Sequence, residues 1–269
     1  MKDNTSIGFI GFGQMGAAIA YAIHQSFLNI NLYVVESNED RQDWIRTNHP
    51  EVNQVSIEAL CDACEFIFLA IKPQHVTDLA HQVKPFLTNR HCLISMLAGV
   101  SHASCLSLFQ PANIIRIMPN TPAKLSKGVT GVYFLDALPK EMQALGLELC
   151  GAFGKTVQLN SDDDIDVITA ISGSGPAFFY RIIRTFVSFG VDAGLDPQVA
   201  KDAAISTMLG ASYMLLDDPE PDDQIKRVAS PNGTTQAGLE VMDQKEFDTL
   251  MTSVLNRAYE RAVELSKEQ

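Results

Sequence analysis

Long apolar runs, cationic side chains and paired cysteines are all scarce in this sequence of 269 residues. No stretch of about 18 uninterrupted apolar residues occurs, which argues against a membrane-spanning helix. The N-terminus has neither the basic segment nor the cleavage site of a signal peptide, so we expect a cytoplasmic protein. Lysine and arginine number 20 against 32 aspartates and glutamates, giving a formal net charge of -12. That charge makes nucleic acid and anionic membranes poor partners.

The usual residue patterns of metal and nucleophile sites are also missing. The five cysteines are odd in number and irregularly spaced, as expected of free thiols in a reducing compartment. Cys61 and Cys64 form a CxxC pair without a second pair, which argues against zinc. Asp162, Asp163 and Asp164 are adjacent and cannot all face one ion from a helix, so we interpret them as a helix start. The histidines fall in no HExxH or triad pattern, and we predict no metal site.

The first part of the chain alternates short apolar segments with amphipathic ones, which predicts strands alternating with helices. Strands are expected at Ser6–Ile10, Ile30–Val35, Phe66–Ile71, Cys92–Met96, Ile114–Met118, Val129–Leu135 and Thr156–Leu159. The helices between them are expected at Gln14–Phe27, Asn38–Asn48, Val76–Phe86, Ser101–Phe109 and Lys140–Phe153. This alternation implies right-handed crossovers and a parallel, doubly wound sheet over residues 1–160.

The second part, residues 161–269, contains no convincing strand pattern. Helices are expected at Asp162–Ile171, Gly175–Ala193, Pro197–Leu216, Pro219–Ala229, Thr235–Met242 and Lys245–Lys267. The predicted fold is therefore an α/β domain followed by an all-helical domain.

A glycine-rich turn follows the first expected strand and opens the first expected helix, where Gly11, Gly13 and Gly16 match GxGxxG. The first glycine permits a tight turn, the second lets a pyrophosphate approach the backbone, and the third lets helix and strand pack closely. The helix start adds unpaired N–H groups. We therefore predict a Rossmann-like dinucleotide site rather than a plain turn. Its residues are Gly11, Phe12, Gly13, Gln14, Met15 and Gly16.

Glu36 ends the second expected strand, about 20 residues beyond Gly16, where an acidic side chain binds the ribose 2′-OH in such folds. A carboxylate there would oppose the 2′-phosphate of NADPH. Ser37, Asn38 and Arg41 follow at once and could hold a phosphate if Glu36 turned away. The sequence thus favours NADH and leaves NADPH open, and a solvated strand end is the alternative without function.

Two later strand ends also lie where ligands bind in such sheets. Ile71, Lys72 and Pro73 end the long apolar strand, and Lys72 would reach a phosphate or ribose; a surface lysine is the alternative. Asn120 follows another strand between two prolines and would bond the nicotinamide amide or ribose. A rigid turn alone is the alternative for Asn120.

The helical part contains two runs rich in small residues, Ile171–Phe178 and Ala229–Leu239, each of which leads into a helix. Free N–H groups and a helix dipole at such a start suit a small carboxylate without a lysine or arginine. Capping alone does not need so long a run. The cofactor itself carries the chemistry of hydride transfer, so little acid–base machinery is needed, and one hydroxyl such as that of Thr235 near the reacting atoms would suffice.

At these residues the chain resembles pyrroline-5-carboxylate reductases. The motifs that agree, in order along nearly the whole chain, are Gly8–Gly16, Ala70–Pro73, Ile115–Pro122, Ser172–Ala177 and Ser230–Thr235. The resemblance implies reduction of pyrroline-5-carboxylate to L-proline with NADPH or NADH, the last step of proline biosynthesis. It also implies a homodimer with interlocked helical domains, often assembled into larger rings such as decamers.

The same resemblance implies which residues hold the substrate. Thr234 and Thr235 would bind the carboxylate through backbone N–H groups, and the Thr235 hydroxyl would act at the ring nitrogen. Ser174 would help enclose the ring, and the adjoining glycines, Gly175 and Gly233, belong to the same two turns.

The chain departs from the family in the last motif, and two other functions stay open. Asn232 replaces a glycine, and the segment before Ser230 is one residue shorter than usual, so a dinucleotide-binding protein that has lost its chemistry is one alternative. Asn tolerates left-handed backbone geometry better than most residues, so the turn can survive. The other alternative is a β-hydroxyacid dehydrogenase, which needs a lysine on the interdomain helix; Gly175–Ala193 has none.

Overall fold

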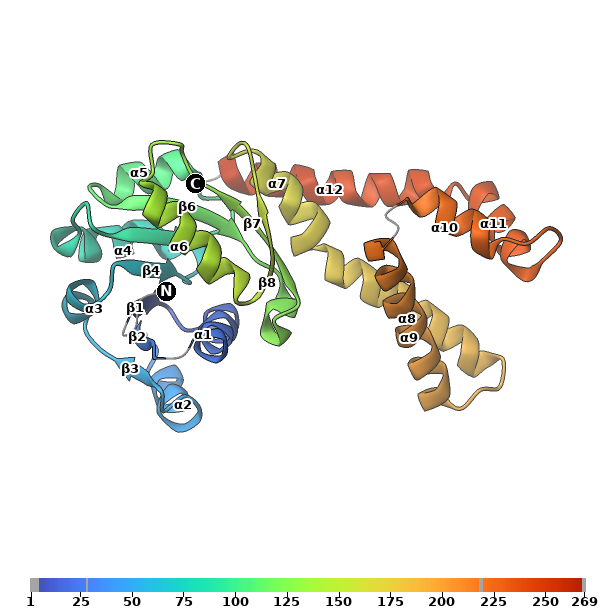
Figure 1. Cartoon of the computed structure of the whole chain (residues 1–269), viewed down its shortest axis with the longest axis horizontal. Coiled ribbons are helices and arrows are strands. Elements are labelled where there is room, and N and C mark those ends of the chain that lie inside the picture. Colours follow the sequence, from blue (N-terminus) through green and yellow to red (C-terminus); the bar gives the residue numbers. More distant parts are fainter. Residues whose placement is uncertain (1–4, 28, 218–219, 268–269) are drawn as a thin grey trace. The chain divides into compact units, whose positions relative to one another are not determined.

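The computed structural model of the chain describes residues 5–27, 29–217 and 220–267. These fall into two compact units, one made of residues 1–174 and 258–269 and the other of residues 175–257. The first unit contains the sheet, and the second is helical (Figure 1). The domain boundary after residue 160 stays a prediction from the sequence.

One eight-stranded sheet forms the first unit, with strand order β3-β2-β1-β4-β5-β6-β7-β8. Its strands are β1 Ser6–Ile10, β2 Asn31–Val35, β3 Val52–Gln54, β4 Phe66–Leu69, β5 Cys92–Ser95, β6 Asn113–Met118, β7 Gly128–Tyr133 and β8 Gly154–Gln158. Neighbouring strands are parallel except β6 and β7. The strand order reverses between β1 and β4, and ligands bind doubly wound sheets outside the carboxyl ends of the strands at such a point.

The expectation of a wholly parallel sheet was wrong at β7. The connection from β6 to β7 covers residues 119–127 and contains only the 3₁₀ helix η3, Thr121–Leu125. A parallel crossover needs a dozen or more residues. The connection is too short for one, so the chain turns back and β7 pairs with β6 in the antiparallel direction.

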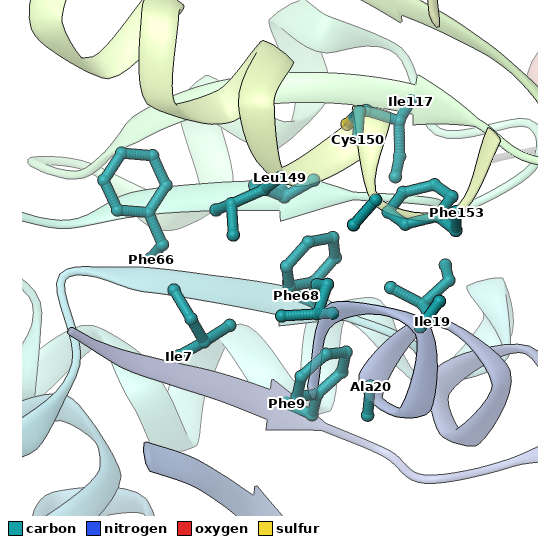
Figure 2. Packing of buried hydrophobic residues seen from close by; sticks show 14 of the residues in the cluster. Ile7, Phe9, Ile19, Ala20, Phe66, Phe68, Ile117, Leu149, Cys150 and Phe153 are labelled. Atoms are coloured by element: carbon teal, nitrogen blue, oxygen red, sulfur yellow. The ribbon is translucent and has the colours of Figure 1, made fainter. Parts of the chain in front are cut away.

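Helices cover both faces of this sheet (Figure 1). They are α1 Gln14–Ser26, α2 Glu39–Asn48, α3 Ile57–Ala63, α4 Val76–Val83, α5 His102–Phe109 and α6 Lys140–Gly151. β4 shows why two layers are needed, because Phe66 and Phe68 belong to one buried cluster, whereas Ile67 and Leu69 belong to the other. On the first face the rings of Phe68 and Phe9 stack with centroids 4.8 Å apart (Figure 2). Burial on both faces explains the unbroken apolar run of this strand.

The second unit is helical throughout the residues that the structure describes, as the sequence predicted. Its helices are α8 Gly175–Asp192, α9 Pro197–Asp217, α10 Pro221–Val228, α11 Thr234–Gln244 and the first half of α12 Phe247–Lys267. Pro219, the expected first residue of α10, lies outside the described residues. α8 and α9 pack at small side chains, since a Cβ on Gly190 would lie 2.9 Å from Cβ of Ala200.

Large apolar side chains of the second unit remain exposed in the single chain, including Phe189 at 74% and Leu216 at 81%. Other exposed members of this set are Phe179, Tyr180, Phe186, Leu209, Tyr213, Val228 and Leu250. Soluble monomers rarely expose so much apolar surface, which marks an interaction surface. None of the described helices has the length and apolar character needed to cross a membrane.

Candidate active site

The three glycines of the β1–α1 turn meet different geometric demands. Gly11 has a φ of +86°, and a Cβ on it would lie 2.7 Å from the carbonyl oxygen of Ala70, so only glycine fits. A Cβ on Gly16 would lie 3.0 Å from the Gly11 carbonyl oxygen, which lets α1 approach the turn closely. A Cβ on Gly13 would have nothing within 4 Å. The backbone at Gly13 is therefore open to a ligand, beside a helix start without side-chain capping.

Gly13→Ala is expected to leave the melting temperature within about 2 °C of the wild type and to weaken dinucleotide binding about tenfold, since the methyl group fills only the space that a pyrophosphate would occupy. Differential scanning fluorimetry and fluorescence titration with NADH measure the two effects. Gly151→Ala is the matched control, because a Cβ at Gly151 also has nothing within 4 Å. Unchanged affinity in Gly13→Ala would remove the turn from the cofactor site.

Glu36, at the end of β2, is joined to the glycine turn. Its Oε2 accepts a hydrogen bond from the Phe12 N–H at 2.9 Å, and its Oε1 accepts one from the Asn38 N–H at 3.0 Å. Arg41 donates from Nε to the Phe12 carbonyl oxygen at 2.6 Å, and its guanidinium lies 3.7 Å from the centre of the Trp44 ring. The carboxylate therefore stands beside the turn, while the arginine is held against an aromatic ring of α2.

The predicted cofactor residues all follow the carboxyl ends of strands on one edge of the sheet. Gly11–Gly16 follow β1, and Glu36, Ser37 and Asn38 follow β2. Ile71, Lys72 and Pro73 follow β4, and a Cβ on Gly11 would lie 2.9 Å from Ile71 Cγ2. Asn120 follows β6. The structure thus brings these separate motifs to one edge.

A cavity of about 560 Å³ borders this edge. Its lining residues are Gln14, Met15, Ala17, Ala18, Tyr21, Arg41, Trp44, His49, Thr121 and Lys124. Gln14 and Met15 belong to the glycine turn, and Thr121 follows Asn120. The glycine turn after β1 and the segment after β6 therefore border the same cavity.

Asn120 is buried, with 7% of its surface exposed. Its Nδ2 donates to the Ser172 carbonyl oxygen at 2.9 Å, and its Oδ1 accepts from the Val129 N–H at 2.9 Å. One amide hydrogen and one oxygen lone pair are left for any other partner. Its contact with a nicotinamide stays a prediction.

The first small-residue turn has an irregular helical geometry. Residues Thr169–Gly173 form a π-helix, η4, and the N–H of Ser174 donates to the Thr169 carbonyl oxygen at 2.8 Å. π turns of this kind often occur at functional sites. Ser174 is half-buried, Gly175 is buried, and α8 begins at Gly175.

The second small-residue turn lies in the helical unit and opens α11. Asn232 has a φ of +57°, the left-handed geometry for which an asparagine can replace a glycine. A Cβ on Gly233 would lie 2.5 Å from Ser230 Oγ and 3.0 Å from the Ser230 carbonyl oxygen, so a larger residue there would displace the Ser230 side chain. α11 begins at Thr234, and among the described residues no side chain caps its first N–H groups. The backbone N–H groups of Thr234 and Thr235 are therefore open to an anion.

Buried Arg116 and His102 form with partly exposed Asp162 a polar cluster that the sequence did not reveal. Arg116 Nη1 lies 2.7 Å from Asp162 Oδ1, and Asp162 Oδ2 accepts the His102 N–H at 2.8 Å. Burial raises the pKa of nearby Asp166 and lowers that of His102. α7, Asp164–Ile168, begins at the third of the adjacent acids Asp162, Asp163 and Asp164, in agreement with the interpretation of a helix start.

The five cysteines are all buried as free thiols. Burial raises the pKa of Cys61 to about 11, that of Cys64 to about 12 and that of Cys150 to about 12. Because the thiolate is the reactive form, these groups are inert near neutral pH. Among the described residues, no group of His, Cys, Asp and Glu side chains is arranged to hold a metal ion.

The folded protein is therefore expected to react slowly with Ellman's reagent at pH 8, and rapidly once it is unfolded in urea. The rate in the folded state should rise as the pH approaches the raised thiol pKa values. Absorbance at 412 nm follows both states. A fast rise in absorbance at 412 nm with the native protein at pH 8 would contradict the burial of these thiols.

Comparison with known proteins gives matches over nearly the whole chain. Residues 162–265 match the family described as pyrroline-5-carboxylate reductase dimerisation, and residues 6–99 match NADP oxidoreductase coenzyme F420-dependent. A pyrroline-5-carboxylate reductase of Pseudomonas aeruginosa is 31% identical over 97% of both chains. One from Staphylococcus saprophyticus is 32% identical, again over 97% of both chains.

Solved structures agree with the sequence relatives. A pyrroline-5-carboxylate reductase from Coxiella burnetii superposes with a TM-score of 0.87 at 28% identity, covering 98% of this chain and 99% of that one. The Streptococcus pyogenes enzyme has a TM-score of 0.86 at 28% identity, covering 98% and 100%. A Plasmodium falciparum pyrroline carboxylate reductase with NADP bound shares the fold, with a TM-score of 0.87, 24% identity and coverage of 99% and 100%. The chain therefore belongs to the pyrroline-5-carboxylate reductase family.

Proposed function

We propose that the chain reduces the C=N bond of 1-pyrroline-5-carboxylate to give L-proline, with NADPH or NADH as the hydride donor. The observation that carries this proposal is the start of α11, where Asn232 in left-handed geometry and Gly233 in extended geometry precede two threonines with open N–H groups. Asn232, which replaces a glycine of the family's motif, adopts the left-handed geometry that the turn needs. This weakens the alternative of a protein that has lost its chemistry.

The substrate carboxylate is held by the backbone N–H groups of Thr234 and Thr235. A helix start with free N–H groups binds an anion without a cationic side chain. This suits an acidic chain, in which a lysine or arginine at the site would attract the abundant carboxylates of the protein itself. Gly233 is the N-cap of α11, and Ser174 with Gly175 encloses the ring from the other small-residue turn.

The chemistry asks little of the protein. The nicotinamide supplies the hydride to the imine carbon, and the protonated ring nitrogen becomes the amine of proline without a further proton transfer. Thr235 accepts a hydrogen bond from the ring N–H and fixes which face of the ring is presented. This is a positioning task, and orientation of this kind can contribute much of a rate enhancement.

The dinucleotide lies along the carboxyl edge of the sheet, with its pyrophosphate at Gly11–Gly16 and its adenosine ribose beside Glu36. Lys72 is exposed at the end of β4 and reaches a phosphate or ribose, and Ile71 and Pro73 form the wall beside it. NADH is the better donor, because the Glu36 carboxylate repels a 2′-phosphate while Arg41 is held by Phe12 and Trp44. Ser37 and Asn38 complete this end of the site.

The working form is a homodimer, which assembles into a larger ring such as a decamer. The exposed apolar side chains of the helical unit and the dimerisation match over residues 162–265 support association through this unit. Light scattering after gel filtration measures the mass. The charge of -12 favours neither nucleic acid nor anionic membranes as partners, and the location proposed is the cytoplasm.

The oxidation of NADH and of NADPH in the presence of pyrroline-5-carboxylate, followed at 340 nm, tests the reaction. A panel of β-hydroxyacids with NAD⁺ tests the remaining alternative, which the lack of lysine in α8 already disfavours. Oxidation that depends on pyrroline-5-carboxylate and yields proline supports the proposal. Turnover of a β-hydroxyacid alone, or binding of dinucleotide without turnover of either substrate, would reject it.

A further inference from the structure

Asn120 joins three segments of the first unit through one buried side chain. It stands two residues after the end of β6, donates to the carbonyl oxygen of Ser172, and accepts from the N–H of Val129 in β7. With 7% of its surface exposed, it has little access to solvent that could replace these bonds. The side chain therefore connects the sheet to the turn that precedes α8.

The carbonyl group of Ser172 needs this donor because of the sequence that follows. In a regular α-helix this oxygen would accept from the N–H four residues later. That residue is Pro176, which has no N–H. The π turn Thr169–Gly173 further departs from regular helical pairing, with Ser174 bonded back to Thr169. The amide of Asn120 supplies the missing donor and fixes the direction of the Ser172 peptide.

We propose that Asn120 is a positioning residue for the substrate, acting through the Ser172–Gly175 turn, and that it is not a ligand of the cofactor. This inference rests on the proposed function, which places Ser174 and Gly175 around the substrate ring. Ser174 lies two residues from the carbonyl group that Asn120 holds, so a rotation of the Ser172 peptide displaces its hydroxyl. The sequence alone predicted a nicotinamide contact for Asn120, and the two roles give opposite kinetic results.

The test is Asn120→Asp across a range of pH. At pH 8 the new carboxylate faces the Ser172 carbonyl oxygen and repels it, so the KM for pyrroline-5-carboxylate should rise about tenfold relative to wild type, as expected for one lost buried hydrogen bond. Burial and the facing carbonyl raise the pKa of the introduced acid. As the pH falls, the protonated carboxyl regains a donor, and the KM ratio should return toward one. The Kd for NADH should stay within about twofold.

Asn113→Asp is the matched control on the other end of the same strand. Asn113 Nδ2 donates to the carbonyl oxygens of Asn89 at 2.9 Å and His91 at 3.1 Å. The same substitution removes comparable bonds there, far along β6 from the Ser172 turn. It should lower the melting temperature without raising the KM for pyrroline-5-carboxylate at any pH.

A weaker Kd for NADH with an unchanged KM for pyrroline-5-carboxylate would overturn the inference and restore the cofactor role. Hydrogen exchange supplies a readout that does not depend on turnover: Asn120→Ala should speed exchange in the peptide 168–178 and leave residues 6–20 unchanged. Wild-type protein without reductase activity would reject the proposed function, and this exchange pattern would still decide whether Asn120 holds the turn. Equal exchange rates of the peptide 168–178 in wild type and Asn120→Ala overturn the inference. So does a failure of both Asn120→Asp and Asn120→Ala to fold.

Discussion

Thr235→Ala is expected to lower kcat for pyrroline-5-carboxylate about 100-fold, the size of the loss when reacting groups are misplaced by about 1 Å. The substitution removes only the hydroxyl and a methyl group at the second residue of α11. Its backbone N–H remains, so the carboxylate contact persists and the KM should change less than kcat. Because the side chain is half-buried and makes no hydrogen bond to another residue in the described part of the chain, the melting temperature should change little.

The controls separate the hydroxyl from the helix start. Thr235→Ser keeps the hydroxyl and should recover most of the turnover. Thr252→Ala removes an exposed threonine within α12 and should match the wild type. Steady-state kinetics at saturating cofactor measure all three variants. Wild-type kcat in Thr235→Ala would show that this hydroxyl takes no part in the reaction.

Much of the sheet could be predicted because its signals are local. The apolar run that forms β4 and the glycine turn after β1 each lie within a few residues of sequence. β3 and α3 were missed because each is short, with three residues in β3 and seven in α3, fewer than the roughly 11 or more residues over which a helical period of apolar positions is usually recognised. The direction of β7 was missed because it depends on the length of the connection rather than on the composition of the strand.

The candidate site could be predicted as a set of motifs but not as a set of contacts. GxGxxG located the turn, and the spacing from Gly16 located Glu36. The bonds from Glu36 to Phe12 and from Asn120 to Ser172 join residues 24 and 52 positions apart. No local pattern specifies such long-range partners, because side-chain hydrogen bonds depend on the fold that brings the groups together. The same reason hid the pairing of Arg116 with Asp162, which are 46 positions apart.

Glu36→Ser is expected to raise the ratio of kcat/KM for NADPH over NADH about 100-fold, the size of one or two hydrogen bonds to a charged group. The carboxylate now occupies the N–H groups of Phe12 and Asn38 and presents negative charge to the ribose. Serine frees both N–H groups for a 2′-phosphate and removes the repulsion. It also removes the acceptor for the ribose hydroxyl, so NADH kinetics should worsen as NADPH kinetics improve.

Glu39→Ser is the matched control for charge, since Glu39 is an exposed carboxylate in the first turn of α2. If bulk electrostatics set the preference, both variants would shift the NADPH to NADH ratio alike. If the contact geometry sets it, only Glu36→Ser will do so, because only Glu36 is bonded to the glycine turn. Identical ratios in wild type and Glu36→Ser would show that the ribose binds away from the end of β2. The cofactor would then have to be held by the remaining strand ends, among them the segment of Lys72 after β4.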